Sequence, residues 1–382
     1  MDKICVILTG GTICSLPDEN KKNQSNAAIT SVRLTEHFRK ESRSPYQNAV
    51  EFDFRVLHPD ILSENMTVRV WSDILKIFRE EIDCAAYKGI IVLHGTDTLA
   101  YTAAFLSLAL AGFPLPVCMV SAQLRLGEER SGKWFAEKKT NGYANFRAAT
   151  ELIMNGIAPN VYAVYRNEAN ENHGSGDLLV HYGAHLLQCK NASNDFHSRD
   201  EMLVKDIKNT KLNGQKSESN SCIYKKLNEI KDSVLMLLPH TGLNYERVSL
   251  EGVCAVVHGT YHSESVCIGR PTDEVRASSK NTVYSLEEIR KEDRPYSILS
   301  LLSRCENKNI PVILAPCNKA TAGYGTTFNA CEKGAHPLAG ITLEAAYAKA
   351  VLACALDLKG NEFLKFMEKS INFETSLKAE NE

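Results

Sequence analysis

The sequence has 382 residues, of which 44% are apolar and 24% are charged, and its formal net charge at pH 7 is −2. This length allows two domains with a sizeable core, and the composition is that of an ordinary soluble globular protein. The small net charge gives no indication of binding to nucleic acid or to an acidic membrane surface, and no apolar stretch reaches the length of a membrane span.

Short apolar runs alternate with helical patterns through the first half of the chain. Strands are predicted at 4–8, 90–93, 116–123, 160–165 and 178–188, the last two as a hairpin, and helices at 72–81, 99–111 and 141–156. Residues 135–139 and 167–176 are expected to be surface insertions. The alternation of strand and helix predicts a parallel sheet covered by helices on both faces.

The composition becomes polar over residues 206–232, which we predict to link two domains. Three more short strands are predicted at 233–239, 254–257 and 310–316, and a helix at 342–356 has Thr342 as a plausible N-cap. We therefore predict an α/β protein. A larger N-terminal parallel-sheet domain with flanking helices covers residues 1–205, and a smaller C-terminal α/β domain covers residues 233–372.

Polar residues gather where two of the predicted strands end. Strand 4–8 is followed by "TGGT" at 9–12, and strand 90–93 is followed by "HGTDT" at 94–98. In open α/β sheets, ligands bind at the carboxyl ends of the strands. Paired glycines let the backbone approach a ligand, and a threonine beyond them can be a nucleophile. The simpler alternative is that these side chains only cap helices, but two such turns in one sheet favour a site.

Other classes of site have weaker support. Neither turn carries a P-loop or G-x-G-x-x-G motif. The twelve cysteines form no C-x-x-C motif, and no His/Cys cluster has the spacing of metal ligands. Reduced cysteines, and an apolar run at 4–8 that is too short for the core of a signal peptide, predict residence in the cytoplasm.

These motifs resemble those of the bacterial-type L-asparaginases, the asparaginase/glutaminase family of amidohydrolases. "TGGTI" at 9–13 and "HGTDT" at 94–98 match the two signature motifs, and "LAYTAA" at 99–104 looks closest to the cytoplasmic type I branch. Further similar segments are "ILSENMTVRVW" at 61–71, "VSAQL" at 120–124, "NGYANFRAA" at 141–149 and "LAGITLEAAYAKAVLACAL" at 338–356. The resemblance runs from residue 3 to about residue 358.

The resemblance implies a two-domain hydrolase that converts the side-chain amide of a free amino acid to carboxylate and ammonia. L-asparagine is the expected substrate, with glutamine as a further possibility, and no metal or organic cofactor is required. A homodimer or homotetramer is expected, whereas nucleic acid and membrane are not expected as partners.

The resemblance also assigns roles to residues by position. Thr12 is expected to be the nucleophile, and Thr96 and Asp97 to belong to a second catalytic group in which a lysine activates the threonine. Ser63 is expected to hold the substrate carboxylate, Asp97 also to face the α-ammonium, and the backbone carbonyl of Ala122 to face the amide. This fits a zwitterionic substrate, which needs donors for its carboxylate and an acid for its ammonium.

Two departures from the family pattern fall on this chemistry. When the sequence is matched to the family pattern without a gap, Asn194 occupies the place of the lysine. The nearest amine is that of Lys190, which is explained equally well as an exposed lysine of a hairpin. Loss of a positioned general base costs about 10²–10⁴-fold in rate. The tyrosine of the mobile loop after residue 13 is absent; Ala27 or Ala28 stands near its place, and Tyr261 is a candidate substitute.

Two further residues have open roles. Glu64, beside the substrate-binding serine position, either adds a carboxylate near the ammonium pocket or faces solvent. His94 precedes the second motif, where a hydrogen-bonded structural residue is more common than a base.

Two other functions are also open. The missing lysine and tyrosine favour a degenerate amino-acid-binding or regulatory module. An ammonia-supplying component of an amidotransferase ranks last, because we expect such relatives to carry a further domain before the first motif.

Overall fold

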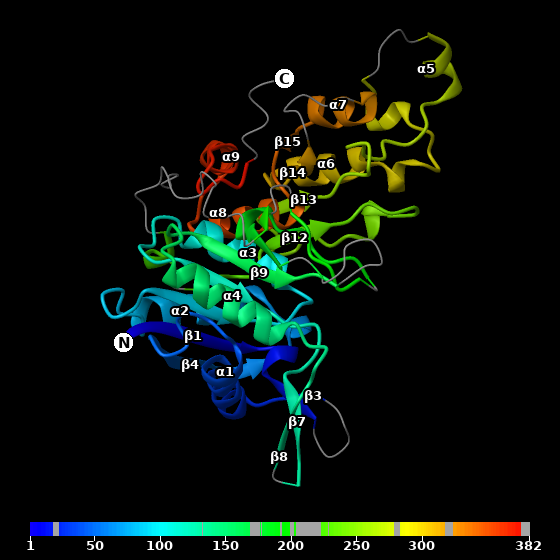
Figure 1. Ribbon diagram of the computed structural model, residues 1–382. Helices are drawn as coiled ribbons and strands as arrows, with labels where there is room; N and C mark the ends of the chain where they lie inside the picture. The colour runs from blue at the N-terminus through cyan, green and yellow to red at the C-terminus, as the bar shows by residue number, and fades with distance from the viewer. Residues whose placement is uncertain are drawn as a thin grey trace. The chain divides into compact units, whose positions relative to one another are not determined.

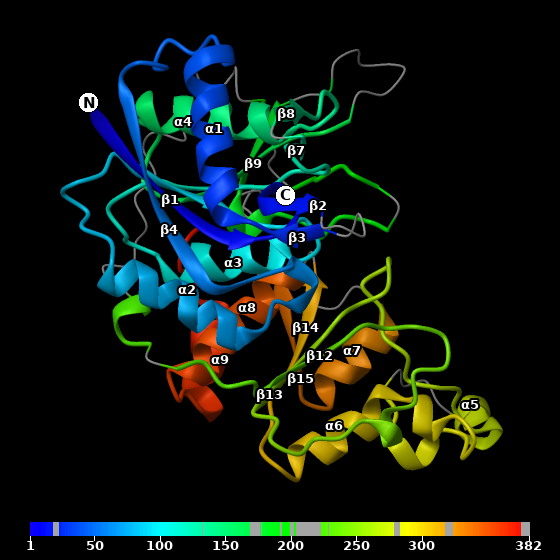
Figure 2. The ribbon, with the colours of Figure 1, turned by 90° about the horizontal axis from the view of Figure 1, so that it is seen from below.

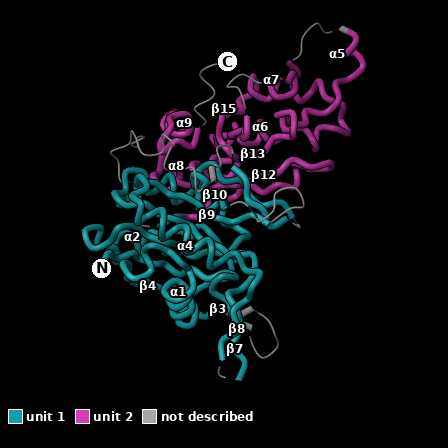
Figure 3. The backbone as a smooth tube through the Cα atoms, viewed as in Figure 1, with its two compact units in different colours: residues 1–230 teal, residues 231–382 magenta. Residues whose placement is uncertain are grey.

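The chain forms two compact units, residues 1–230 and 231–382 (Figure 3). The computed structural model describes residues 1–17, 23–131, 133–168, 176, 178–191, 193–198, 202–203, 223–227, 229–278, 283–317 and 324–375. The predicted linker, 206–232, therefore lies outside the described residues up to residue 222. Beyond it Ile223 and Tyr224 are buried, and the Ile230 N–H donates to Ser72 Oγ (2.9 Å), so this stretch packs within the first unit.

The first unit is built on a seven-stranded sheet in the order β11-β10-β9-β6-β5-β1-β4. The strands are β1 (Asp2–Gly10), β4 (Val50–Ile61), β5 (Gly89–Leu93), β6 (Val117–Val120), β9 (Val161–Arg166), β10 (Leu178–Tyr182) and β11 (Met202–Leu203). The five strands from β9 to β4 in this order are parallel, whereas β9–β10 and β10–β11 pair antiparallel. The predicted parallel sheet and the hairpin at its edge are confirmed.

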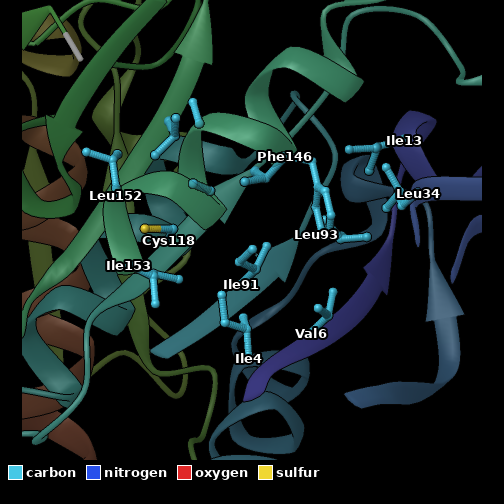
Figure 4. Packing of buried hydrophobic residues seen from close by; sticks show 14 of the residues in the cluster. Ile4, Val6, Ile13, Leu34, Ile91, Leu93, Cys118, Phe146, Leu152 and Ile153 are labelled. Atoms are coloured by element: carbon cyan, nitrogen blue, oxygen red, sulfur yellow. The ribbon is translucent and has the colours of Figure 1, made fainter. Parts of the chain in front are cut away.

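Helices cover both faces of this sheet. The helices are α1 (Ala27–Glu41), α2 (Val68–Glu80), α3 (Leu99–Ala109) and α4 (Gly142–Met154). Figure 2 shows α1 and α4 on one face and α2 and α3 on the other. Ile91, Leu93 and Cys118 of the strands pack with Phe146 of α4 in the core cluster on the first face (Figure 4).

The expectation of a mobile loop after residue 13 is wrong from Ala27 onward, because α1 begins there. Asn26 caps this helix by accepting the N–H three residues further on (3.0 Å). Thr30, Leu34 and Phe38, spaced by four residues, form its buried face. The segment is therefore anchored in the core of the first unit from its first helical turn.

Two small hairpins leave the main sheet. One joins β2 (Ser15–Pro17) to β3 (Asn23–Ser25), and the other joins β7 (Gly127–Arg130) to β8 (Lys133–Ala136) and extends away from the sheet (Figure 1). Phe135 in β8 is 51% exposed, as expected for a surface insertion at 135–139. Most of the insertion expected at 167–176 lies outside the described residues.

The second unit has a four-stranded parallel sheet in the order β12-β13-β14-β15. Its strands are β12 (Val234–Leu237), β13 (Ala255–His258), β14 (Val312–Cys317) and β15 (Ala335–Ala339), and its helices are α5 (Asp273–Ser278), α6 (Ile298–Glu306), α7 (Gly325–Glu332), α8 (Leu343–Ala355) and α9 (Gly360–Glu368). The predicted cap of α8 is confirmed, because Thr342 Oγ1 accepts the Ala345 N–H (3.1 Å). No helix among the described residues combines the length and apolar character needed to cross a membrane.

A fully buried ion pair fixes the end of the described chain to the second unit. Lys349 Nζ of α8 lies 2.6 Å from Glu374 Oε1, and neither side chain is exposed. The ammonium also donates to the carbonyl of Lys369 (2.7 Å). The carboxylate accepts the N–H groups of Ile371 (2.9 Å) and Asn372 (2.8 Å). Burial alone would raise the pKa of Glu374, but the Lys349 ammonium and these N–H donors outweigh it and hold that pKa below its ordinary value.

Lys349→Met is expected to lower the free energy of unfolding by about 3–5 kcal/mol, because it leaves the Glu374 carboxylate buried without its counter-charge. The measurement is denaturant unfolding followed by circular dichroism. Both tryptophans, Trp71 and Trp134, lie in the first unit, so their fluorescence does not report on this one.

The exposed pair Lys359–Asp357 (2.9 Å) provides the matched control: Lys359→Met should leave the free energy of unfolding nearly unchanged, because water screens an exposed pair. The double variant Lys349→Met/Glu374→Leu should recover most of the loss. Since the folded-state pKa of Glu374 lies below its unfolded value, its stabilisation is present at neutral pH and is lost as the pH falls through the folded pKa. A Lys349→Met variant as stable as the parent would contradict this account.

Candidate active site

Two strand ends of the first unit meet through glycine backbone. β1 and β5 are parallel neighbours, with Leu8 paired to Leu93, so both end at the same edge of the sheet. A Cβ atom at Gly11, whose φ is +79°, would lie only 2.3 Å from the Cα of Gly95. No other residue fits at position 11, and each glycine is followed directly by a threonine. The backbone therefore brings positions 12 and 96, both partly exposed, to one place at the sheet edge.

The end of β4 joins the same place. The Gly11 N–H donates to the carbonyl of Ile61 (2.9 Å), and a short 3₁₀ turn, Ser63–Asn65, follows the strand. A Cβ at Gly95 would fall 2.3 Å from Ser63 Oγ, so Ser63 packs against the glycine between β5 and α3. Three neighbouring strands thus deliver the predicted residues Thr12, Ser63 and Thr96 to one edge.

Ser63 is buried and holds the Asp97 turn through three hydrogen bonds. Its hydroxyl donates to Asp97 Oδ2 (3.2 Å) and accepts the Asp97 N–H (3.2 Å). Thr98 Oγ1 donates to the Ser63 carbonyl (2.8 Å). Asp97 itself is exposed, so a ligand can reach its carboxylate. Thr98 consequently has a structural role, which links the start of α3 to the turn after β4.

Gln188 is a residue of this region that the sequence did not point to. Its side-chain N–H donates to the carbonyl of Asp97 (2.7 Å), although the two residues are 91 positions apart. It follows the short 3₁₀ turn Gly183–His185 after β10. A single glutamine outside any motif gives no sequence signal.

Lys190 lies two residues beyond this contact, and its side chain is exposed. Its carbonyl accepts the Ser193 N–H (3.0 Å), which closes a turn. Among the described residues, no hydrogen bond or ion pair joins the Lys190 amine to Thr96 or Asp97. Asn194 points elsewhere, since its side chain donates to Glu168 (2.7 Å).

Ala122 and Glu64 differ in environment. Ala122 is buried just beyond β6, and the next residue is held by a hydrogen bond from the Gln123 N–H to Asn141 Oδ1 (3.0 Å). The Ser121 carbonyl accepts from Asn145 Nδ2 (2.9 Å), which fixes the same strand end to α4. Glu64 is exposed, in agreement with the solvent-facing alternative.

His94 is a buried, neutral part of the turn. Burial lowers its pKa to about 4, although the hydrogen bond to Gly95 and the charge of Asp97 act in the opposite direction. Its Nδ1 lies 2.7 Å from the Gly95 carbonyl oxygen. A carbonyl oxygen only accepts, so Nδ1 carries the hydrogen. The structure thus agrees with a hydrogen-bonded structural residue at this position.

No group of three or more His, Cys, Asp or Glu side chains in the described ranges is arranged to hold a metal ion. The described cysteines are all free thiols. The groups at this edge of the sheet are hydroxyls, a carboxylate, amides and a neutral imidazole. Such a set suits the recognition of a small polar molecule and nucleophilic attack by a hydroxyl.

The chain resembles known proteins in sequence and in fold. The family model described as "Asparaginase, N-terminal" matches residues 3–218, more than half of the chain. Among curated proteins, the chain is 36% identical over 123 residues to a subunit of the glutamyl-tRNA(Gln) amidotransferase of Methanosarcina barkeri, covering 32% of this chain and 27% of that protein. It is 27% identical over 256 residues to the corresponding protein of Methanococcus maripaludis, covering 64% and 55%. The matches therefore span from about a quarter to just over half of these relatives.

Solved structures share the fold along nearly the whole chain. The thermostable L-asparaginase from Thermococcus kodakarensis aligns with a TM-score of 0.67 at 20% identity, covering 98% of this chain and 99% of that one. L-asparaginase I from Vibrio cholerae aligns with a TM-score of 0.66, with the same identity and coverage. At this identity the likeness concerns the fold, and it confirms the predicted α/β architecture with a smaller second unit.

Gly11→Ala is expected to lower the free energy of unfolding by at least about 1–3 kcal/mol, because the new Cβ meets the backbone of Gly95 and the residue keeps a positive φ. Denaturant unfolding followed by tryptophan fluorescence measures it, since both tryptophans belong to the first unit.

Gly325→Ala is the matched control, followed by circular dichroism because Gly325 lies in the second unit. A Cβ there has no atom within 4 Å, so its stability should be unchanged or slightly higher. Equal stability of the Gly11→Ala variant and the parent would refute the close glycine contact.

Proposed function

The chain belongs to the asparaginase family, and on this premise we propose that it hydrolyses L-asparagine to L-aspartate and ammonia. The single observation that carries the proposal is the convergence of Thr12, Ser63, Thr96 and Asp97 at the ends of β1, β4 and β5. A free amino acid carries both charges and an amide, and this edge offers a group for each. On the same premise we propose a homodimer or homotetramer in the cytoplasm that needs no cofactor.

Recognition of the zwitterion divides between two of these residues. The Asp97 carboxylate is exposed and oriented by Ser63, so it can pair with the α-ammonium of a substrate. Neighbouring backbone N–H groups are the proposed donors to the substrate carboxylate, together with the Ser63 hydroxyl, whose single hydrogen then turns from Asp97 Oδ2 to the substrate. Because Ser63 and Asp97 are in contact, the two charged ends of the substrate bind next to each other.

The proposed reaction proceeds through an ester. Thr12 Oγ attacks the amide carbon as a base takes the hydroxyl proton, and the C–N bond breaks as a proton reaches the nitrogen, which leaves as ammonia. Water then attacks the ester carbon, and its proton returns to Thr12 as L-aspartate departs. Thr96 is the proposed relay between the base and the reacting centre, and Lys190 is the candidate base.

A second candidate function is an amino-acid-binding or regulatory module. Desolvation is what makes a lysine amine neutral and basic, and Lys190 is exposed, which favours this alternative. It expects aspartate or asparagine to raise the melting temperature without turnover.

The similarity to the glutamyl-tRNA(Gln) amidotransferases favours a third candidate function, release of ammonia from an amide substrate on behalf of a partner. It expects turnover of glutamine as well as asparagine, so both amino acids belong in every assay.

Thr12→Ala and Thr96→Ala are each expected to abolish ammonia release from L-asparagine while leaving the melting temperature within a few degrees, because each removes one partly exposed hydroxyl. Ammonia is measured with purified protein at saturating substrate. Thr35→Ala, in α1 and away from the site, is the control and should keep the parental rate. The proposal fails if the parent releases no ammonia from asparagine, glutamine or D-asparagine.

Lys190→Met is expected to lower kcat by about 10²–10⁴-fold with little change in KM, because it removes the candidate base but no substrate contact. Lys40→Met, at an exposed position near the end of α1, controls for loss of a surface charge. A Lys190→Met variant with parental kcat would assign activation of Thr96 to another group and leave the role of Thr12 intact.

A further inference from the structure

The two units carry the same three-residue turn at the end of a parallel strand. His94-Gly95-Thr96 follows β5, and His258-Gly259-Thr260 ends β13. Both imidazoles are fully buried. In each, Nδ1 lies within hydrogen-bond distance of the carbonyl oxygen of the next glycine, at 2.7 Å for His94 and 2.5 Å for His258. Both rings therefore carry the hydrogen on Nδ1 and present Nε2 as a buried acceptor.

The two turns differ in what reaches this acceptor. In the second unit the Tyr245 hydroxyl lies 2.8 Å from His258 Nε2 and donates to it. In the first unit, none of the described residues provides a hydrogen-bond partner for His94 Nε2. Burial lowers the pKa of His94 to about 4, so the ring is neutral at neutral pH. Nε2 therefore takes up no proton and still needs a hydrogen-bond donor.

Ser121 presents a second buried polar atom without a partner among the described residues, its Oγ. Leu93 of β5 is in register with Val120 of β6, and the His94 N–H continues this pairing by donating to the Val120 carbonyl (2.9 Å). Leu93, which is labelled in Figure 4, and Val120 both belong to the core cluster that includes residues of α1 and α4. His94 and Ser121 directly follow these two strands. Because side chains alternate between the faces of a sheet, we infer that both project to the opposite face as neighbours.

We propose that one buried water molecule bridges His94 Nε2 and Ser121 Oγ. Water donates to the imidazole nitrogen and exchanges a second hydrogen bond with the hydroxyl, which satisfies both groups. A buried acceptor without a hydrogen-bond donor is destabilising. In the second unit the Tyr245 hydroxyl is the donor to the corresponding imidazole nitrogen. The water thus occupies the place that a tyrosine hydroxyl takes in the second unit.

This water links two strand ends that carry proposed site residues. His94 precedes Thr96 by two positions, and Ser121 directly precedes Ala122. His94 and Ser121 are therefore positioning residues, which hold the tips of β5 and β6 in one arrangement. The catalytic consequence rests on the proposed amidohydrolase function, whereas the binding of water does not.

The decisive experiment is a crystal structure of the full chain at a resolution that places waters, together with imidazole ¹⁵N NMR. One water is expected within hydrogen-bond distance of both His94 Nε2 and Ser121 Oγ in the parent, and it should be lost or displaced in Ser121→Ala. The His94 Nε2 resonance should shift in Ser121→Ala but not in Tyr245→Phe, and the His258 resonance should do the reverse. An empty or apolar site in the parent, or a His94 ring protonated on Nε2, would overturn the proposal.

The positioning role has its own readout. With asparagine as substrate, Ser121→Ala is expected to lower kcat by about tenfold with a smaller change in KM, because misplacement rather than lost substrate contact is its cause. Ser121→Thr keeps the hydroxyl and should restore much of kcat. A bound water with unchanged kcat in Ser121→Ala would overturn positioning. If the parent shows no turnover, the proposed function is contradicted, whereas the crystallographic and NMR tests of the bound water still apply.

Discussion

The contact between the backbones of Gly11 and Gly95 is the constraint on which the candidate active site depends. Neighbouring parallel strands lie about 4.8 Å apart, and side chains at their ends would keep the following turns apart. Two glycines let the turns touch, and Ser63 packs against the second one. The backbones at positions 12 and 96 are thus brought together by main-chain geometry, which does not depend on how flexible side chains arrange themselves. The hydrogen bond from Gly11 to Ile61 adds a third strand to the same arrangement.

Much of this could be read from the sequence, because the central strands and α3, α4 and α8 are rich in apolar residues and α8 also has a capping residue, Thr342. The family motifs also marked the residues at the ends of β1 and β5. Strand β15, "AHPLA", contains a histidine and a proline and has no strand pattern, and it exists because it pairs with β14. Helix α1 was not predicted, because a polar segment precedes it and only Thr30, Leu34 and Phe38, four residues apart, form its buried face. Gln188 was missed because its contact with Asp97 joins residues far apart in the chain.

The repeated His-Gly-Thr turn shows that one local sequence can serve two purposes. In the second unit the turn is completed by the protein itself, through Tyr245 on the imidazole and a hydrogen bond from Thr260 to the Pro316 carbonyl (2.8 Å). In the first unit Ser63 and Gln188 hold the residue after the turn, and Asp97 is left open to solvent. The surroundings of the turn, more than the turn itself, therefore distinguish a structural corner from a candidate reaction centre.

The buried Lys349–Glu374 pair sets a boundary for shortening the chain from its carboxyl end. A carboxypeptidase that removes residues up to and including Thr375 leaves the Glu374 carboxylate in place. The hydrogen bonds that this carboxylate accepts from the N–H groups of Ile371 and Asn372 also remain. Removal of one further residue strips the counter-charge from an ammonium in the interior of the second unit. Resistance of the second unit to heat should then change abruptly between two neighbouring cleavage positions, although both lie far along the chain from the candidate active site.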